Sequence, residues 1–451
     1  MQHHSIKSHS HHRLLISGVD LWNASGVEKS VDIAIEDGIV VKIARDLDLN
    51  DHLDFVIVRA DGYTLMPAGV DAQVHLRVPG QAQKETATSG LWAAVSGGVG
   101  ALLTMPNTKP VLDNTETLAL AKREIAGPEA ETGVRVLFSA AMTIGQRGHE
   151  VVDFSALARA GVFAFTDDGV GVADDKIMLA VFKGAAPTGL PVLQHAEVPG
   201  HGGVLAGGPV QIAIGSIAYP VAAEVDMVQR DLDLLKQVPA ARYHVLHVSA
   251  GGTLGLVAAA KKSGLHVTCE ASPHHLFFTS ADIEPDNSAF KMNPPIRSAV
   301  DRSELQAALA SGACDFMATD HAPHESAVKT NNFKTSAFGT TGLETSLRVM
   351  IDLWQKGTLS AMRLVDAWAT APSAFLGISS THGEISVGRP MNAVLCDVTA
   401  KQSEIMESDF AGLSRNSCFI GTKLPGLVLA TILGQKVHCL RGFNFDPKKS
   451  V

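Results

Sequence analysis

The stretch Asp71-Ala72-Gln73-Val74-His75-Leu76-Arg77 closes an apolar run, 63–70, that is typical of a buried β-strand. Residues two apart on a strand point to the same side, so Gln73, His75 and Arg77 should project together where the strand ends. A histidine and an arginine at the carboxyl end of a strand suit a site that holds a metal ion and an anion. Taken alone, the stretch favours a half-exposed strand end with one ordinary histidine, and the pattern gains weight only because similar strand ends recur.

Strand and helix patterns alternate eight times from about residue 64 onward. The candidate strands span 64–75, 100–105, 135–142, 161–166, 191–195, 243–248, 266–271 and 314–319. Segments with helical spacing lie between them, at 86–96, 115–124, 175–183, 221–235, 253–262 and 302–309. Eight such repeats predict an α/β fold of the TIM (β/α)8 barrel type, with its functional site at the carboxyl ends of the strands. A doubly wound open sheet fits less well, because no GxGxxG motif follows the first strand.

Both ends of the chain have the pattern of short β-strands joined by polar turns. We expect these ends to pair into one small β-sandwich domain. The predicted division is a small β domain made from residues 13–63 and 383–451, and a catalytic barrel over residues 64–382. Residues 1–12 contain five histidines and no apolar run, and they are expected to form a disordered tail without a role in the chemistry.

The composition favours a soluble enzyme that acts on small molecules. The net charge of -9 and the pI near 6.1 argue against a nucleic-acid footprint. No apolar run reaches the length of a membrane span. The five cysteines are dispersed, with no CxxC spacing, which is typical of reduced thiols in a cytoplasmic protein.

Ionisable residues recur at the carboxyl ends of the candidate strands. His75, Asp168, His195, His247 and Asp320 each follow a different strand, and such groups are rarely placed there without partners. Imidazole and carboxylate are the ligands that zinc and its neighbours prefer. A bound metal would polarise a carbonyl and lower the pKa of a water molecule, while an aspartate passes the proton to a leaving nitrogen. The residues alone therefore predict metal-dependent hydrolysis of an amide-like bond.

From about residue 65 to residue 377 the chain resembles the class I dihydroorotases of the amidohydrolase superfamily. The stretches that carry the resemblance are His75-Leu76-Arg77, Met105-Pro106-Asn107-Thr108, Phe165-Thr166-Asp167-Asp168-Gly169, Ser272-Pro273-His274-His275-Leu276, Lys291-Met292-Asn293-Pro294-Pro295-Ile296-Arg297, Ala318-Thr319-Asp320-His321-Ala322-Pro323-His324 and Phe338-Gly339-Thr340-Thr341-Gly342. The resemblance implies a zinc-dependent interconversion of N-carbamoyl-L-aspartate and L-dihydroorotate, the third step of pyrimidine biosynthesis.

The resemblance also implies roles for individual residues. His75, Asp168 and Asp320 match the ligands of one zinc ion, and Asp168, His195 and His247 match those of another, with Asp168 bridging. Asp320 matches the general acid and base. Arg77 and Asn107 match groups that bind the α-carboxylate, and the full set at substrate-binding positions is His75, Arg77, Asn107, Asn293, His324, Phe338 and Gly339.

Other polar residues near the strand ends are expected to support the site without binding a metal. Asp167 is interpreted as a turn residue or as a partner of a ligand. Glu197 is interpreted as a group that orients a ligand or caps the next helix. Three histidines are expected to contact metal ligands on the side away from the metal and so to orient them: His274, His275 and His321.

Gln73 is the main departure from the His-x-His pattern of the family. Because a carboxamide oxygen is a much poorer zinc ligand than an imidazole nitrogen, we expect one tightly bound zinc ion and a second that is weakly bound or absent. Two alternatives to an active dihydroorotase stay open. One is a catalytically inactive subunit that scaffolds aspartate transcarbamoylase, which Gln73 favours. The other is a hydantoinase or allantoinase, which the two aspartates before Gly169 disfavour. A homo-oligomer is compatible with each of these functions.

Overall fold

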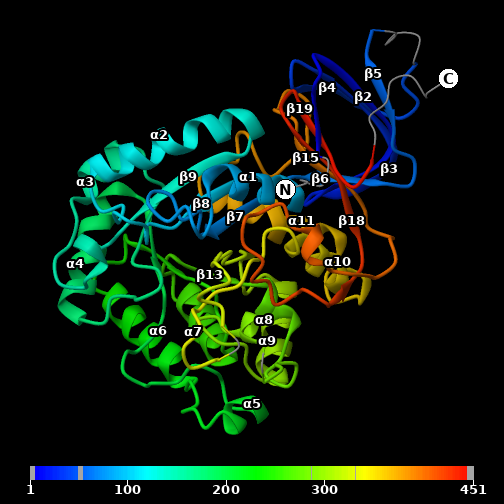
Figure 1. Cartoon of the computed structure of the whole chain (residues 1–451). Coiled ribbons are helices and arrows are strands. Elements are labelled where there is room, and N and C mark those ends of the chain that lie inside the picture. Colours follow the sequence, from blue (N-terminus) through cyan, green and yellow to red (C-terminus); the bar gives the residue numbers. More distant parts are fainter. Residues whose placement is uncertain (1–5, 49–53, 286, 331, 444–451) are drawn as a thin grey trace.

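An eight-stranded parallel barrel forms the larger part of the molecule (Figure 1). The computed structural model of the chain describes residues 6–48, 54–285, 287–330 and 332–443. The barrel strands are β7 (Gly69–Val74), β8 (Val99–Thr104), β9 (Arg135–Ala140), β10 (Ala164–Thr166), β11 (Pro191–Gln194), β12 (Arg242–Val245), β13 (Val267–Ala271) and β14 (Phe316–Met317). The barrel closes beyond β14, where the amide of His75 donates to the carbonyl of His321 at 2.8 Å. The predicted TIM barrel is confirmed.

Helices surround the barrel and bury its outer face. The main ones are α1 (Ala87–Gly97), α2 (Thr115–Thr132), α3 (Phe154–Arg159), α4 (Asp175–Ala185), α6 (Ala222–Leu235), α7 (Gly251–Lys262), α9 (Ala299–Ser311) and α10 (Ser346–Gln355). Shorter helices complete the chain path: α5 (Pro209–Ala213), α8 (Pro273–Phe277), α11 (Ala361–Val365) and α12 (Ala371–Phe375). The largest apolar cluster lies between these helices and the strands, and a smaller one fills the barrel interior. Both layers hold the carboxyl ends of the strands in fixed positions.

Strands from both ends of the chain share a second sheet, beside the barrel (Figure 1). Its order is β1 (Lys7–Ser10), β19 (Lys436–Cys439), β18 (Leu427–Leu433), β15 (Asn392–Asp397), β6 (Thr64–Pro67), β2 (Arg13–Asn23), β3 (Gly26–Glu36) and β4 (Ile39–Ala44), with β5 (Val56–Arg59) paired to β2. Strand β6 joins the two ends, because it pairs with β2 on one side and with β15 on the other. This confirms the prediction of a small β domain built from both ends.

The strand expected over residues 64–75 is in fact two strands in two sheets. Residues of β6 belong to the sheet of the chain ends, whereas β7 opens the barrel. The amide of Ala68, between them, donates to the carbonyl of Asn392 at 3.0 Å. A continuous apolar run conceals this change of sheet, because both strands are buried along their whole length.

The expectation of a disordered tail over residues 1–12 is wrong for its described part. Residues 7–10 form β1, which pairs antiparallel with β19. All four side chains of β1 are exposed, so the strand has no apolar alternation and is held by main-chain hydrogen bonds to its neighbour. Residues 1–5 of the predicted tail lie outside the described residues.

The segment between β15 and β18 does not stay with the β domain. It contains β16 (Ser403–Glu404) and β17 (Lys423–Leu424), and residues 411–419 contact the barrel. The amides of Ala411 and Gly412 donate to Glu344, at 2.9 and 3.0 Å. Part of the chain after the predicted boundary at residue 383 therefore packs against the barrel and not against the β domain. The division into separate domains stays a prediction.

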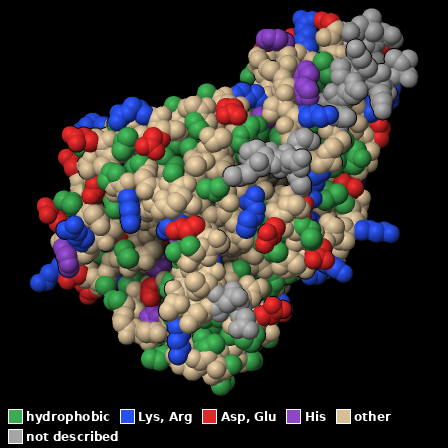
Figure 2. Space-filling model, in the orientation of Figure 1, with side chains coloured by type: hydrophobic (Ala, Val, Ile, Leu, Met, Phe, Trp, Pro, Cys, Tyr) green, Lys and Arg blue, Asp and Glu red, His purple; other side chains and the backbone are tan. Residues whose placement is uncertain are grey.

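The surface carries charges of both signs. Figure 2 shows acidic and basic side chains interspersed over the face in view. Among the described residues, no helix combines the length and the apolar character that crossing a bilayer requires. The five cysteines are buried and free of disulfides.

Candidate active site

The carboxyl ends of the barrel strands surround a cavity of about 180 Å³. Its lining consists of His75, Arg77, Asn107, Asp168, Gly169, His195, Asn293, Asp320, Ala322, His324, Phe338 and Gly339. Every residue singled out as a ligand, proton carrier or substrate contact is in this set except His247. The structure places His247 directly behind the lining, with its Nε2 atom 3.0 Å from Nδ1 of His195. The barrel thus brings all the predicted site residues together.

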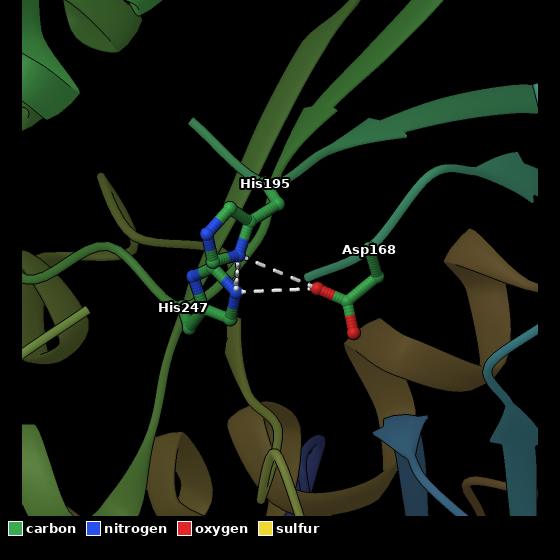
Figure 3. Close-up of side chains that lie close together, drawn as sticks. All are labelled: Asp168, His195 and His247. Atoms are coloured by element: carbon green, nitrogen blue, oxygen red, sulfur yellow. Dashed lines mark hydrogen bonds and ion pairs between the residues drawn. The ribbon is translucent and has the colours of Figure 1, made fainter. Parts of the chain in front are cut away.

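Asp168, His195 and His247 form a compact group of possible metal ligands (Figure 3). The two imidazole nitrogens face each other at 3.0 Å, and each lies 3.5 Å from Oδ1 of Asp168. A tetrahedral zinc ion with bonds of about 2.0–2.1 Å spaces its ligand atoms by about 3.3 Å, which is close to these three distances. The group fits zinc in both donor type and spacing.

His75, Asp168 and Asp320 form a second such group, which shares Asp168. Nε2 of His75 lies 3.1 Å from Oδ2 of Asp168 and 3.1 Å from Oδ1 of Asp320. Each oxygen of Asp168 therefore faces a different group, as a bridging carboxylate requires. Nδ1 of His75 lies 2.9 Å from Oδ1 of Asn107, which can only accept, so a neutral His75 has its proton on Nδ1 and its lone pair on Nε2.

Charge in this cluster is balanced between imidazoles and carboxylates. Burial would lower the pKa of His75 and of His195, but neighbouring carboxylates outweigh it and raise both pKa values to about 9. Burial would raise the pKa of Asp168, yet the three surrounding histidines hold it well below its usual range. Protons on the histidines and a metal cation are alternative ways to neutralise these carboxylates.

A β-bulge in β7 turns Gln73 toward the interior of the barrel. Between Asp71 and Val74 the strand advances three residues while its neighbour β8 advances two. Ala72 belongs to the apolar cluster inside the barrel, whereas Val74 packs in the cluster under the helices. Because side chains alternate along a strand, Gln73 and His75, on either side of Val74, both face inward.

The carboxamide of Gln73 is fully buried and unpaired. Among the described residues, neither Oε1 nor Nε2 of Gln73 has a hydrogen-bond partner. An unpaired buried amide costs about 1–3 kcal/mol, so this position favours a polar guest such as a metal ion or a water molecule.

Three residues of the site have backbone conformations that are rare for side chains other than glycine. The φ angles are +60° for Arg77, +34° for His247 and +49° for Asp320. Each residue lies just past the end of a barrel strand, where the chain leaves the sheet. Left-handed conformations of this kind persist when the surrounding structure enforces them, and they cluster at functional sites.

Arg77 supplies a buried cation to the cavity. Its Nη2 atom lies 3.2 Å from Nε2 of His324, and its Nε donates to the carbonyl of Pro323 at 3.2 Å. Burial lowers the pKa of Arg77 to about 10, which leaves the guanidinium charged at neutral pH. None of the ion pairs found in the described part of the chain includes Arg77, so this cation is available to an anionic substrate.

Another wall of the cavity is formed by Asn293, Phe338 and Gly339, and Nδ2 of Asn293 lies 3.2 Å from Nε2 of His195. The ammonium group of Lys291 lies 4.4 Å from the centre of the Phe338 ring, and the carbonyl of Lys291 accepts from the amide of Gly339 at 2.9 Å. Asn416 fastens this wall from the segment after β15. Its side chain bonds the amide of His324 at 3.0 Å and the carbonyl of Gly339 at 3.1 Å.

Sequence reasoning did not identify Asn416 as part of the site. It lies in a segment assigned to the β domain, and its contacts are all with backbone groups of two distant loops. No spacing rule links these segments, although the polar run 414–417 between apolar residues is a signal that the segment is not a plain strand.

Asp167 and Glu197, both expected to support the site, make contacts of different kinds. Asp167 accepts from the amides of Met142 and Thr143 and from the hydroxyl of Thr143, so it anchors a loop. Glu197 contacts Nε2 of His195 at 3.1 Å, which favours the orienting role over the helix cap. The three histidines expected to orient ligands are all buried: His274, His275 and His321. Among the described residues, none of their side chains has a hydrogen bond to a proposed metal ligand, so their orienting role stays a prediction.

Comparison with known proteins identifies relatives of the chain over nearly its whole length. A family model described as Dihydro-orotase-like matches residues 62–252. The dihydroorotase of Lactiplantibacillus plantarum is 39% identical over 427 residues, covering 94% of this chain and 97% of the relative. The dihydroorotase of Shouchella clausii is 37% identical over 425 residues, covering 93% and 96%.

Solved structures of a dihydropyrimidinase and an L-hydantoinase share the fold. The dihydropyrimidinase from Brevibacillus agri matches with a TM-score of 0.82 at 22% identity, covering 96% of both chains. The L-hydantoinase from Arthrobacter aurescens matches with a TM-score of 0.81 at 24% identity, covering 93% of this chain and 94% of the other. At these identities the likeness extends to the fold alone.

Proposed function

The chain belongs to the dihydroorotase family, and on this premise we propose that it is a metal-dependent cyclic amidohydrolase that interconverts N-carbamoyl-L-aspartate and L-dihydroorotate in pyrimidine biosynthesis. The observation that carries the proposal is one cavity that joins three functions. Residues of two possible metal-binding groups line it, one of these groups includes Asp320, and the lining cation Arg77 has no ion-pair partner among the described residues. The proposed substrate has an amide bond on which the metal and Asp320 can act, and a carboxylate that Arg77 can bind.

We propose zinc as the metal, held by Asp168, His195 and His247. Two imidazoles and a carboxylate with one open position are a common donor set for catalytic zinc. When bound, the ion supplies polarisation of the scissile carbonyl and a lowered pKa for a water molecule. The second group, with Gln73 where the family pattern has histidine, is proposed to bind a metal weakly or not at all.

Asp320 is proposed to carry the proton. Its Oδ1 lies 3.1 Å from His75, and the residue lines the cavity. In ring opening, Asp320 takes a proton from the attacking water and delivers it to the departing ring nitrogen. In ring closure, the same carboxyl group moves the proton in the opposite direction. His75 holds the carboxylate in place during both transfers.

Arg77 and Asn107 are proposed to orient the substrate through its α-carboxylate. A guanidinium forms two parallel hydrogen bonds to a carboxylate, which fixes the angle as well as the position of the substrate. Asn293, His324, Phe338 and Gly339 enclose the remaining surface of the ring.

Replacing Arg77 by lysine is expected to raise KM about tenfold to 100-fold while the melting temperature stays close to that of the wild type. Lysine keeps the charge but loses one charge-assisted hydrogen bond, worth roughly 1.5–3 kcal/mol. Steady-state kinetics with L-dihydroorotate and thermal unfolding measure the two effects, and Arg123→Lys on the exposed face of α2 is the matched control. A collapse of the melting temperature with an unchanged KM would make Arg77 a structural residue.

Zinc binding is expected to strengthen as the pH rises toward about 9. The pKa of His195, a proposed ligand of the tightly bound zinc ion, is raised to about 9 in the metal-free protein, so His195 is protonated at neutral pH and the metal must displace that proton. Affinity should rise about tenfold per pH unit for this displaced proton and level off above this pKa. Competition with a chelator of known pH dependence gives the zinc dissociation constant at each pH. An affinity independent of pH would contradict this charge balance.

Turnover of L-dihydroorotate by the purified protein, measured together with its zinc content, tests the proposed function. An active enzyme opens the ring and contains zinc. A chain that binds zinc but turns over hydantoin instead would be a hydantoinase. A chain without turnover of either compound would support the inactive subunit that scaffolds aspartate transcarbamoylase.

A further inference from the structure

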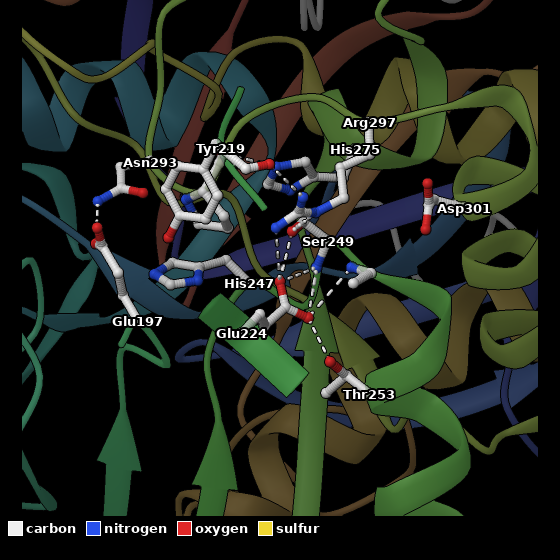
Figure 4. A network of polar contacts seen from close by, with 12 residues as sticks. Glu197, Tyr219, Glu224, His247, Ser249, Thr253, His275, Asn293, Arg297 and Asp301 are labelled. Carbon is white, nitrogen blue, oxygen red and sulfur yellow. Dashed lines mark hydrogen bonds and ion pairs between the residues drawn. The ribbon is translucent and has the colours of Figure 1, made fainter. Parts of the chain in front are cut away.

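Glu197 contacts both the proposed metal ligand His195 and Asn293 of the cavity lining, and Figure 4 shows its carboxylate facing Asn293. Its Oε2 atom lies 3.1 Å from Nε2 of His195 and accepts from Nδ2 of Asn293 at 2.7 Å. Its Oε1 atom lies 2.6 Å from Nε2 of His201. One carboxylate therefore joins a metal ligand, a residue of the cavity wall and a histidine outside the cavity.

The proton positions in this group follow from fixed donors. The backbone amide of Gly203 donates to Nδ1 of His201 at 3.1 Å, so the proton of a neutral His201 is on Nε2, which faces Glu197. The ring of His201 also packs against Tyr219, with ring centres 4.1 Å apart. The contacts at both ring nitrogens and with the ring of Tyr219 thus hold His201 in the orientation that donates to Glu197.

The same logic fixes the tautomer of His195. An ionised carboxylate can only accept, so Oε2 of Glu197, 3.1 Å from Nε2 of His195, pairs with a proton on that nitrogen. Nδ2 of Asn293 lies 3.2 Å from the same Nε2 but only 2.7 Å from Oε2, so its N–H is directed at Glu197. A neutral His195 with its proton on Nε2 presents a lone pair at Nδ1. That nitrogen is the one directed at Asp168 and His247.

We infer that Glu197, anchored by His201, is a positioning residue that fixes His195 as a metal ligand and couples it to Asn293. Carboxylate partners of this kind orient metal-binding histidines and increase their basicity. His201 acts through Glu197, and within the described part of the chain it belongs to neither the cavity lining nor the metal-binding groups. The inference rests on the proposed function only in that a metal binds at Asp168, His195 and His247.

Replacing Glu197 by glutamine tests the role of the carboxylate. The amide has one accepting oxygen, and its NH2 group meets a donor on the other side, so the three N–H groups cannot all be accepted. The zinc dissociation constant, measured by competition with a chromophoric chelator, is expected to rise about tenfold to 100-fold. The melting temperature of the metal-free protein should stay unchanged, which separates positioning from a general loss of structure.

Two substitutions of His201 test the anchor. His201→Ala is expected to weaken zinc binding about tenfold, and His201→Gln, which keeps an N–H donor, is expected to restore most of the affinity. His266→Ala is the matched control, since His266 is exposed at the opposite end of the barrel, before β13. His266→Ala should leave the zinc dissociation constant unchanged.

The inference is overturned if Glu197→Gln binds zinc within twofold of wild type, or if His201→Ala and His201→Gln behave alike. If Glu197→Gln lowers the melting temperature of the metal-free protein, the zinc affinities of the two His201 variants decide whether the inference holds. Zinc affinity does not depend on turnover. A protein that bound zinc through this group without opening dihydroorotate would therefore support the inference and contradict only the proposed function.

Discussion

Replacing Asp320 by asparagine is expected to lower kcat for L-dihydroorotate by about 10²–10⁴-fold, the usual contribution of a general acid and base. Asparagine keeps the size of the side chain and can still contact His75, but it cannot take a proton from water and return it to the ring nitrogen. Steady-state kinetics in both directions measure the loss. Ring opening and ring closure should fall by the same factor, because one group carries the proton in each.

Asp320 also belongs to the second group of metal ligands, so its loss must be separated from a loss of metal. The tighter metal is expected at Asp168, His195 and His247, which the substitution leaves intact. Zinc content of the variant should therefore stay near that of the wild type. Asp233→Asn, at an exposed aspartate of α6, is the matched control and should keep full activity. Activity above roughly a tenth of wild type would remove Asp320 from the role of proton carrier.

Replacing Gln73 by histidine is expected to raise the zinc content from about one to about two ions per chain and to increase turnover. The side chain at this position faces the barrel interior, and its amide has no partner among the described residues. An imidazole would add the nitrogen donor that zinc prefers to the group formed by His75, Asp168 and Asp320. Elemental analysis and kinetics at a fixed zinc concentration measure the two effects.

Gln73→Leu is the matched control for this gain. Leucine fills a similar volume without a ligand atom, so it should bind no additional zinc, and it should stabilise the protein because the unpaired amide is removed. If Gln73→His gains a metal without activity, the defect lies elsewhere and the inactive scaffold becomes the better description. If the wild type already holds two tightly bound zinc ions, the account of Gln73 is wrong.

The barrel and the position of its site follow from patterns that the sequence displays directly. Eight strand–helix repeats predict the fold, and parallel strands bring their carboxyl ends to one face. For that reason His75, Asp168, His195, His247 and Asp320 could be placed in one site before any coordinates. Their assignment to two groups came from the family resemblance and not from spacing.

Other parts of the site depend on features that have no linear pattern. The bulge that turns Gln73 inward adds one residue to β7, and an alternating pattern does not reveal it. The left-handed conformations of Arg77, His247 and Asp320 arise where the chain leaves the sheet, and tertiary contacts impose them. Asn416 lies 77 to 94 residues from the loop residues that it bonds, and only the folded structure brings them together.

The two ends of the chain also contain features that the sequence pattern does not predict. Strand β1 has four exposed polar side chains, so propensity and alternation both argue against a strand there. It forms because β19 offers an unpaired edge of main-chain donors and acceptors. The change of sheet between β6 and β7 is equally hidden, since burial is complete on both sides of Ala68.

The central claim, that this chain is a metal-dependent dihydroorotase, is tested most directly by removal and return of the metal. The purified protein is treated with a chelator, and turnover of L-dihydroorotate is measured before treatment, after it, and after addition of zinc. The account predicts ring opening that is lost with the metal and restored by about one zinc ion per chain. A fully zinc-loaded, folded protein that does not open L-dihydroorotate would contradict it.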